Sequence, residues 1–339
     1  MRQLRAVVRA LDTVESRPVR WLWPRRAAVG KVTLLAGDPG LGKSFVTLDL
    51  AARVSTGVLP ESGSQCEPGP HDVLLLSAED DPGDTIRPRL EKLGADLRRI
   101  HCVGGVRLDD APRIRQLSLD THLAQLADCV KLMSSPKLLI VDPISAYMGK
   151  VDSHNNAETR GLLAELGRFA EHFGMAVVCV THLNKSGAQG KAVYRAMGSL
   201  AFTAAARIVL LVSKHPDDQA KRLVVPVKNN LTRDAESLVY RIEDDCLSWV
   251  DEACAYTADD LEASADAGDK PDALGEAVEW LGDALKDGPR GAREVLSEAK
   301  GVGIAEITLK RAKRTLGVIA RPSEGVGSAW TWSLRRSGS

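Results

Sequence analysis

Gly37-Asp38-Pro39-Gly40-Leu41-Gly42-Lys43-Ser44 is the stretch that decides the fold of this chain. It satisfies the pattern G-x-x-x-x-G-K-[ST], in which main-chain N–H groups of a loop surround phosphate oxygens. Residues 31–36 before it form a short apolar run, and residues 43–55 after it lack glycine and proline and place apolar side chains at helical spacing. Because strand, loop and helix is the order that this pattern requires, the sequence predicts a phosphate-binding loop here.

The residue types of this loop suit a nucleoside triphosphate and a magnesium ion. Glycine permits backbone conformations that turn N–H groups toward phosphate, and the start of a helix adds unpaired donors and a positive dipole. We expect Lys43 to bridge the β- and γ-phosphates and the hydroxyl of Ser44 to ligate Mg²⁺. The residues expected to contact the nucleotide are Gly37, Asp38, Pro39, Gly40, Leu41, Gly42, Lys43, Ser44 and Phe45.

Short β-rich runs alternate with helical stretches between residues 30 and 212, which is typical of a mostly parallel sheet covered by helices on both faces. The expected strands of this part are residues 31–36, 72–77, 99–103, 137–141, 175–181 and 206–212. Further antiparallel strands are expected at residues 222–228, 238–242 and 246–250. The predicted fold class is therefore α/β.

With 339 residues, the chain has room for roughly two domains. We expect a lead-in over residues 1–29, a large domain over 30–250, a flexible acidic linker over 251–272 and a small domain over 273–339. The net charge of zero hides a segregation of charge. Residues 243–272 carry eleven Asp and Glu against one Lys, and residues 290–339 carry ten Lys and Arg against four Glu. The overall charge therefore identifies no class of partner.

The small domain is predicted to contain three helices followed by a strand pair, in which Trp330 and Trp332 share one face. This order suits a winged helix, a fold whose third helix can enter the major groove of DNA. The basic residues that avoid the apolar stripe of that helix are Lys310, Arg311, Lys313 and Arg314. A solvated basic face on a domain that binds protein is the alternative interpretation.

Cysteine usage and hydropathy favour a reduced, cytoplasmic protein. The six cysteines are scattered without a C-x-x-C pair, so we expect structural thiols and no zinc site. No stretch approaches the roughly 18 uninterrupted apolar residues of a membrane-spanning helix, and the N-terminus has no cleavable apolar core. We therefore expect no association with a membrane.

Two further strands are predicted to end in carboxylates near the phosphate loop. Asp142 ends one apolar run and is expected to hold the metal together with Ser44. Glu79 follows another apolar run and is expected to orient or deprotonate the attacking water. Asp80 and Asp81 come directly after Glu79 and stay open as alternatives for that role.

A third strand ends in Thr181 and His182, which are placed to contact the γ-phosphate and to report its loss to the segment that follows. That segment spans residues 184–197 and includes Lys185, Lys191 and Arg195. A basic loop attached to a nucleotide sensor is suited to grip the phosphate backbone of DNA. A plain surface loop is the alternative.

Several segments of the chain occur together in one known family. They are Trp21-Leu22-Trp23-Pro24, Gly37 to Ser44, Ser77-Ala78-Glu79-Asp80, Leu138 to Pro143, Val180-Thr181-His182, Arg195 to Arg207 and Val227-Lys228-Asn229. As a set they resemble the RecA-like hexameric ATPases of the plasmid RepA helicase type, which are close to the replicative helicases of bacteria and phages. The small domain is similar to winged-helix tails of such ATPases on mobile elements.

The resemblance implies that ATP and Mg²⁺ bind between the subunits of a homohexamer and that a cation of one subunit acts on the nucleotide of its neighbour. Arg207 and Lys228 are the candidates for that cation, and the sequence does not choose between them. The resemblance also places Trp21, Trp23 and Arg25 near the adenine or the adjacent subunit, with hydrophobic packing as the alternative for the tryptophans.

The function implied by the resemblance is an ATP-driven motor on single-stranded or forked DNA, namely a replicative helicase of a plasmid, phage or other mobile element. A separate primase or initiator protein would then be a partner, because this chain has no primase-like segment. The alternative is a DNA-binding regulatory or recombination-mediating ATPase that does not unwind DNA. A small-molecule kinase also fits the phosphate loop but leaves the basic small domain without a role.

Overall fold

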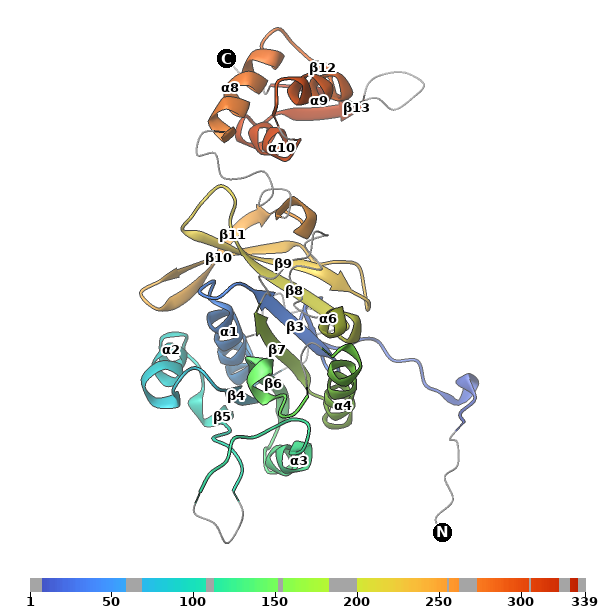
Figure 1. Ribbon diagram of the computed structural model, residues 1–339, viewed down its shortest axis with the longest axis vertical. Helices are drawn as coiled ribbons and strands as arrows, with labels where there is room; N and C mark the ends of the chain where they lie inside the picture. Colours follow the sequence, from blue (N-terminus) through green and yellow to red (C-terminus); the bar gives the residue numbers. More distant parts are fainter. Residues whose placement is uncertain are drawn as a thin grey trace. The chain divides into compact units, whose positions relative to one another are not determined.

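The computed structural model of the chain has two compact units, Met1–Thr257 and Ala258–Ser339. The structure describes residues 8–58, 69–107, 113–151, 155–182, 200–254, 256–261, 273–304, 306–322 and 330–334. Figure 1 traces the chain through both units and labels their elements.

A nine-stranded sheet forms the frame of the first unit, in the order β11-β10-β9-β8-β3-β7-β6-β4-β5. The strands from β8 to β5 run parallel, and β9, β10 and β11 extend the sheet as antiparallel strands. The parallel strands are β3 (Val32–Gly37), β4 (Asp72–Ser77), β5 (Ile100–Cys102), β6 (Pro136–Asp142), β7 (Ala176–His182) and β8 (Ile208–Lys214). The antiparallel strands are β9 (Lys221–Asn229), β10 (Ser237–Glu243) and β11 (Cys246–Cys254). The mostly parallel sheet confirms the predicted α/β class.

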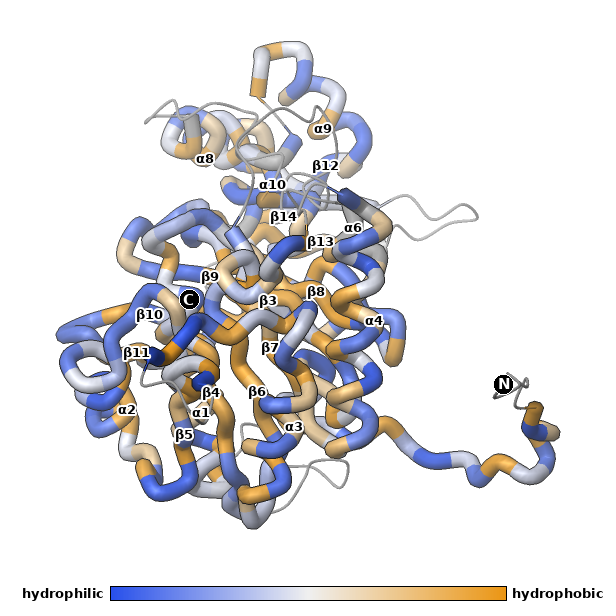
Figure 2. Tube along the Cα trace, turned by 60° about the horizontal axis from the view of Figure 1, so that its bottom comes forward, coloured by the Kyte–Doolittle hydropathy of each residue, from blue (hydrophilic) through white to orange (hydrophobic). Residues whose placement is uncertain are grey.

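Helices cover both faces of this sheet (Figure 1). One apolar cluster joins the sheet to α1 (Lys43–Thr56) and α2 (Arg87–Lys92). A second cluster joins the opposite face to α3 (Leu123–Lys131), α4 (Asn156–Phe173) and α6 (Leu200–Ala205). Leu34 and Leu35, neighbours in β3, belong to opposite clusters, so the central strands are apolar on both sides, and Figure 2 shows them as the hydrophobic centre of the unit. Short helical turns lie at η1 (Leu11–Thr13), η2 (Pro82–Ile86), η3 (Leu97–Arg99) and η4 (Ile144–Tyr147).

The segment before the phosphate loop is part of this core from Trp21 onward. β1 (Trp21–Trp23) and β2 (Ala27–Ala28) form a small antiparallel pair in which every residue is buried. The rings of Trp23 and Trp249 contact edge to face, with their centroids 5.9 Å apart. The core therefore begins earlier than residue 30, where the sequence placed its start, and the tryptophans adopt the packing alternative.

The other boundary of this unit also differs from the prediction. β11 continues to Cys254, beyond the expected end at residue 250. Tyr256 is only 5% exposed, and its main-chain carbonyl accepts a hydrogen bond of 2.6 Å from the hydroxyl of Ser237. The first part of the predicted linker is thus folded against the sheet. Although this segment is acidic overall, it contains Tyr256, whose aromatic side chain is buried. Residues 262–272 of that linker lie outside the described residues.

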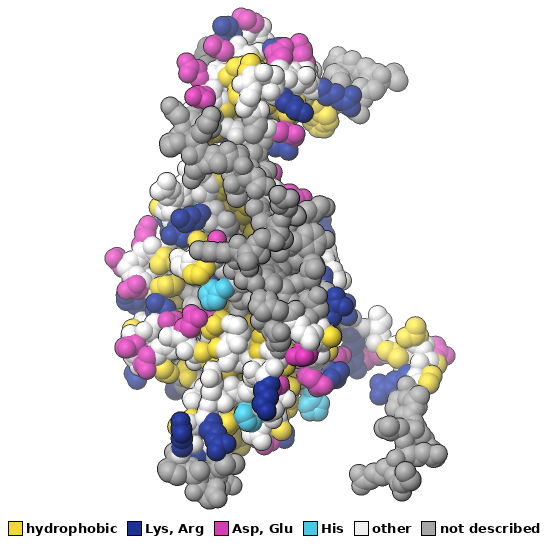
Figure 3. Space-filling model, in the orientation of Figure 1, with side chains coloured by type: hydrophobic (Ala, Val, Ile, Leu, Met, Phe, Trp, Pro, Cys, Tyr) yellow, Lys and Arg dark blue, Asp and Glu magenta, His cyan; other side chains and the backbone are white. Residues whose placement is uncertain are grey.

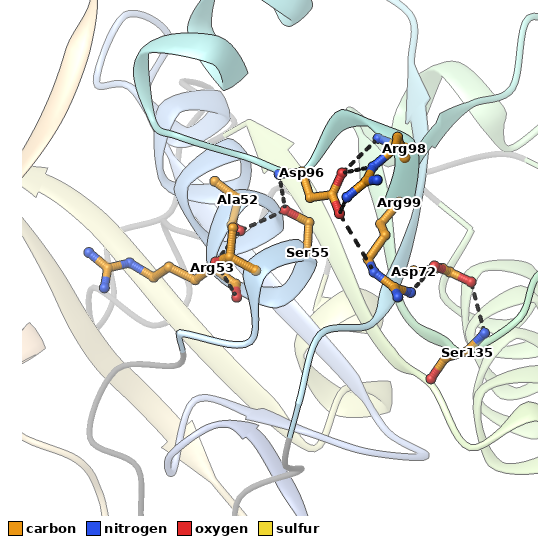
Figure 4. Close-up of polar contacts among 9 residues, drawn as sticks. Ala52, Arg53, Ser55, Asp72, Asp96, Arg98, Arg99 and Ser135 are labelled. Atoms are coloured by element: carbon orange, nitrogen blue, oxygen red, sulfur yellow. Dashed lines mark hydrogen bonds and ion pairs between the residues drawn. The ribbon is translucent and has the colours of Figure 1, made fainter.

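A polar network holds the edge strand β5 at the amino ends of the strands (Figure 4). The carboxylate of Asp72 accepts hydrogen bonds from the guanidinium of Arg99 at 2.9 Å and from the main-chain N–H of Ser135 at 2.8 Å. The main-chain N–H of Asp96 donates to the hydroxyl of Ser55, near the end of α1, at 2.9 Å. This network ties together the edge opposite to the phosphate loop, and its contacts are structural.

Between residues 273 and 334, the described part of the second unit forms three helices and a three-stranded sheet of order β12-β14-β13. Its elements are α8 (Ala273–Leu285), β12 (Arg290–Gly291), α9 (Ala292–Gly301), α10 (Glu306–Thr315), β13 (Ile319–Pro322) and β14 (Trp330–Ser333). Three helices and a strand pair follow each other as the sequence predicts, and the short strand β12 is an addition. Trp332 is packed into the core of this unit, whereas Trp330 is 52% exposed.

Charges of both signs are interspersed over the described part of one face of the molecule. On the face that Figure 3 shows, basic and acidic side chains mix on each unit and do not gather into one patch of a single sign. Within the described part of the chain, no helix combines the length and apolar character needed to cross a membrane.

Candidate nucleotide-binding site

The carboxyl ends of four neighbouring strands converge at one edge of the sheet. β3, β7, β6 and β4 lie next to each other in that order. Their register pairs Gly37 with His182 and Ser77 with Asp142. Ligands of open α/β sheets bind beyond the carboxyl ends of the strands. The structure therefore brings the phosphate loop, the predicted sensor and the predicted metal residue together at such an edge.

The loop between β3 and α1 has the backbone that anion binding needs. Gly40 and Gly42 have φ angles of 76° and 87°, in the left-handed region that favours glycine. Gly42 caps α1 without a side-chain hydrogen bond, so the first N–H groups of the helix suit an external acceptor such as phosphate. A Cβ atom at Gly42 would lie 2.3 Å from Cδ1 of Ile242, so the Ile242 side chain would have to shift, and the positive φ would strain any other residue.

Lys43 is buried under the loop, with 5% of its surface exposed. Its Nζ atom donates to the main-chain carbonyls of Gly37 at 2.8 Å and Asp38 at 2.9 Å, and lies 3.3 Å from Nδ1 of His182. Burial lowers the pKa of Lys43 below its ordinary 10.5, and nearby carboxylates, of which Asp142 acts most strongly, oppose this shift. An additional anion at this point would stabilise the ammonium further.

Ser44 and Asp142 fit the magnesium ion that the motif implies. The hydroxyl of Ser44 hydrogen-bonds to the carboxylate of Asp142, and both residues line a small pocket with Asp80. Burial raises the pKa of Asp142, the hydrogen bond from Ser44 lowers it, and the charges of Asp80 and Glu79 raise it. Hydroxyl and carboxylate oxygens are the ligands that Mg²⁺ prefers, and a divalent cation would offset the negative charge gathered here.

Three successive carboxylates follow β4, and the structure separates their contacts. Asp81 caps η2 by accepting hydrogen bonds from main-chain N–H groups of that turn. Asp80 forms an ion pair with Arg89, with 3.1 Å between Oδ2 and Nη1. Oε1 of Glu79 lies 3.6 Å from Nε2 of His182, and the Glu79 side chain is 64% exposed. Among the three, Glu79 is thus the carboxylate directed toward His182.

His182 connects the phosphate loop with the predicted water-activating carboxylate. One ring nitrogen faces Lys43 and the other faces Glu79. β7 ends at His182, so these contacts lie at the start of the segment that follows. The predicted basic residues of that segment, Lys185, Lys191 and Arg195, lie outside the described residues.

The strands β10 and β11 anchor the phosphate loop from the side, which the sequence did not predict. The buried hydroxyl of Tyr240 donates to the main-chain carbonyl of Leu41 at 2.7 Å. Nε1 of Trp249 donates to Oδ2 of Asp49 on α1 at 2.8 Å. The rings of Tyr240 and Trp249 contact edge to face, with centroids 5.6 Å apart. No sequence signal could have found these contacts, because they join strands and a loop that are distant in the chain.

The two candidates for a cation acting on a neighbouring subunit differ in their contacts. Nζ of Lys228 donates to the main-chain carbonyls of Thr203 at 2.7 Å and Ala206 at 2.8 Å. Burial and the nearby charge of Arg207 lower the pKa of Lys228. In this structure the ammonium of Lys228 holds the carboxyl end of α6, where a cation is favourable, and its role toward a neighbouring subunit stays a prediction. Arg207 is exposed.

The basic residues of α10 also differ from each other in their exposure and contacts. Lys310 is exposed and pairs with Glu306 one helical turn earlier at 3.1 Å. Nζ of Lys313 lies 4.4 Å from the ring centroid of Trp332, and burial lowers its pKa. The ammonium of the half-buried Lys313 thus packs on its own unit, and its predicted contact with DNA stays a prediction. Arg311 is half-buried, and the Arg314 side chain lies outside the described part.

The chain is similar to a protein family and to individual proteins of known name. A protein-family model described as "AAA domain" matches residues 2–188. "DNA repair protein RadA" of Bacillus subtilis (strain 168) is 26% identical over 161 residues, and that of Mycobacterium tuberculosis (strain ATCC 25618 / H37Rv) is 30% identical over 162 residues. Each similarity covers 47% of this chain and 29% or 28% of the relative, so the chain matches less than a third of the length of these relatives.

Proposed function

This chain belongs to the AAA-domain family and has a RecA-like P-loop fold. We therefore propose that it binds and hydrolyses Mg-ATP and that this hydrolysis drives a process on DNA. The observation that carries the proposal is the convergence of Lys43, Asp142, Glu79 and His182 at the carboxyl ends of four neighbouring strands. The residues that we propose for phosphate binding, metal binding, water activation and sensing thus lie close together, which supports the proposal.

Each side chain then has a chemical task. The loop N–H groups and Lys43 hold the phosphates, and Ser44 and Asp142 hold the metal. When bound, Mg²⁺ neutralises charge that develops on the phosphate oxygens during transfer. Glu79 orients a water molecule for attack in line with the leaving group and accepts its proton. His182, which contacts both Lys43 and Glu79, responds to the presence of the γ-phosphate.

We propose further that the ring of a homohexamer completes the site. Arg207, exposed beside the carboxyl end of α6, is then the cation that one subunit offers to the nucleotide of its neighbour. Such a cation stabilises the charge of the transition state and can raise the rate of hydrolysis by a factor of about 10³ or more. The support for this step is the resemblance of the motifs to RecA-like ring ATPases together with the exposure of Arg207.

We propose that ATP hydrolysis drives movement of the protein along single-stranded or forked DNA, as in a replicative helicase of the RepA type. The second unit would act as a winged helix that recruits DNA through Lys310 and Arg311, and a separate primase or initiator would supply priming. A recombination-mediating ATPase that does not unwind DNA is the second candidate. It is favoured by the similarity to proteins named for DNA repair.

Three measurements test these proposals. ATP hydrolysis by the full chain should rise several-fold on addition of single-stranded DNA, and rates that are indifferent to DNA would count against work on DNA. Strand displacement from a forked duplex, together with a particle of six subunits under ATP, would support the motor. An open filament or a dimer without strand displacement would support the recombination-mediating ATPase.

A further inference from the structure

Arg89 links the two segments that frame the proposed site. Its Nη1 atom donates to Oδ2 of Asp80, the residue after Glu79, at 3.1 Å. Its guanidinium carbon lies 4.2 Å from the centroid of the Phe45 ring, directly after Ser44 in the first turn of α1. The side chains of Arg89 and Asp80 are 22% and 29% exposed, so the ion pair is partly shielded from water. One guanidinium thus contacts both the acidic turn and the helix of the phosphate loop.

The helix that carries Arg89 is itself firmly placed. Ile86 and Leu90, on either side of Arg89 in the chain, are 3% and 2% exposed and belong to the apolar cluster under α1. Nζ of Lys92 donates to the main-chain carbonyl of Asp244 at 2.7 Å, in the turn that joins β10 and β11. Because its backbone is held by apolar packing and by this contact, Arg89 can fix the position of the groups that it touches.

Glu79 needs such support from its neighbours. Its side chain is 64% exposed, and its carboxylate lies 3.6 Å from His182, beyond hydrogen-bond distance. The main chain of the turn is tied to β6 by the N–H of Ala78, which donates to the carbonyl of Asp142 at 3.0 Å. The side chain of Asp80 provides a tie to α2 on the other side of Glu79. A reacting carboxylate has to be held within about 0.5 Å of its productive position, so these ties matter.

We propose that Arg89 is a positioning residue for ATP hydrolysis, which holds the turn of Glu79 against the helix of the phosphate loop through Asp80 and Phe45. The inference rests on the proposed function and adds a residue to it. A guanidinium suits the task because its planar face stacks on an aromatic ring while the N–H groups at its edge donate to a carboxylate. Lysine carries the same charge but lacks both the plane and the fork of donors.

The test compares three variants of the full chain by steady-state ATP hydrolysis and by equilibrium binding of a non-hydrolysable ATP analogue. In Arg89→Gln and Arg89→Lys, we expect kcat to fall about tenfold to a hundredfold, as misplacement of a reacting group does, with analogue affinity within about threefold. Arg87→Gln is the matched control, since Arg87 lies on the same helix, is 67% exposed and pairs with Glu91 on the surface. It should leave both quantities unchanged.

A double-mutant cycle completes the test. If Arg89 acts through Asp80, the variant Asp80→Asn should lower kcat similarly, and the double variant should be no slower than the slower single variant. Three results would overturn the inference. The first is equal kcat values in Arg89→Gln and Arg87→Gln. The second is a loss of analogue affinity with kcat retained, which would mean that Arg89 binds nucleotide. The third is additive effects of the Arg89 and Asp80 substitutions on kcat. Absence of turnover in the unaltered chain would instead reject the proposed function as well.

Discussion

Nδ1 of His182 lies 3.3 Å from Nζ of Lys43, and Nε2 of the same ring lies 3.6 Å from Oε1 of Glu79. The imidazole therefore stands between the residue that we propose to hold the phosphates and the residue that we propose to activate water. This contact joins the end of β7 to the phosphate loop, and we propose that the ring passes the nucleotide state to the chain after β7.

Replacement of His182 by alanine should separate binding from turnover. We expect kcat for ATP hydrolysis to fall about tenfold or more, because Glu79 and Lys43 lose the group between them, while ATP affinity changes little. Stimulation by single-stranded DNA should be lost. Steady-state kinetics with and without an oligonucleotide measure both effects. His172→Ala, at the exposed end of α4, is the control, and equal behaviour of the two variants would contradict the role of His182.

Replacement of Asp142 by asparagine should stabilise the chain without ligand while abolishing hydrolysis. Burial raises the pKa of Asp142 above 3.8, so the fold disfavours the carboxylate that is present at neutral pH. As pH rises from 3.8 through the raised pKa, this group lowers the free energy of unfolding, and a neutral amide removes that cost. The midpoint of thermal unfolding should rise by about 2–4 °C for each kcal/mol relieved.

Mg-ATP should reverse this order of stability. Addition of Mg-ATP should stabilise the unaltered chain more than the Asp142→Asn variant, because the variant keeps the phosphate loop but loses a metal ligand and therefore binds Mg-ATP less tightly. Differential scanning calorimetry in both conditions gives the comparison. A variant that unfolds at a lower temperature than the unaltered chain without ligand, or that still hydrolyses ATP, would show that Asp142 is a structural residue.

The pKa of Lys43 predicts how nucleotide affinity depends on pH. Burial lowers this pKa below 10.5 in the folded chain, and the protonated form is the one that attracts phosphate. Affinity for ATP should therefore fall as pH rises through the lowered pKa, well before an exposed lysine would lose its proton. Without ligand the sign is opposite, because the folded chain binds fewer protons than the unfolded chain and the free energy of unfolding rises with pH up to 10.5.

Titration calorimetry across the alkaline range measures this dependence. Lys43→Arg keeps the charge at every pH of the experiment and should make the affinity, although lower, independent of pH over the same range. If the unaltered chain and Lys43→Arg lose affinity in parallel, another group is responsible for the titration.

The hydroxyl of Tyr240 should matter for the phosphate loop. Tyr240→Phe keeps the buried ring and removes only the hydrogen bond to the carbonyl of Leu41. Loss of such a bond costs about 0.5–1.5 kcal/mol, which corresponds to a decrease in ATP affinity of about twofold to tenfold if the loop is the part that loosens. Tyr147→Phe, which alters a buried tyrosine packed on the opposite face of the sheet, is the control. Equal ATP affinities of the two variants would contradict an anchoring role.

Local patterns in the sequence were sufficient for the elements that carry the site. The apolar run before the loop and the apolar run before Glu79 both became central strands, because a strand buried on two faces must be continuously apolar. The convergence of Asp142 and His182 with the loop also followed from the sequence, since parallel strands bring their carboxyl ends to one edge. These predictions needed only the order and direction of the strands.

The side-chain partners of the site could not be predicted in this way. Tyr240, Arg89 and Lys228 act through contacts with main-chain or aromatic groups elsewhere in the fold, and nothing in their own local sequence marks those contacts. The same holds for Lys313, whose helical spacing indicated a basic face suited to DNA but whose ammonium packs on the ring of Trp332. Charge and spacing alone do not show whether a cation faces solvent.

Phosphate release from Mg-ATP by the purified full chain, compared with Glu79→Gln, tests the central claim most directly. Glu79 has the exposure and the orientation toward His182 that a water-activating carboxylate requires. The unaltered chain should turn over ATP, and the variant should bind ATP with similar affinity but release phosphate at least about a hundredfold more slowly. Equal rates in the two proteins, or no release by the unaltered chain with or without DNA, would contradict the proposal that this site hydrolyses ATP.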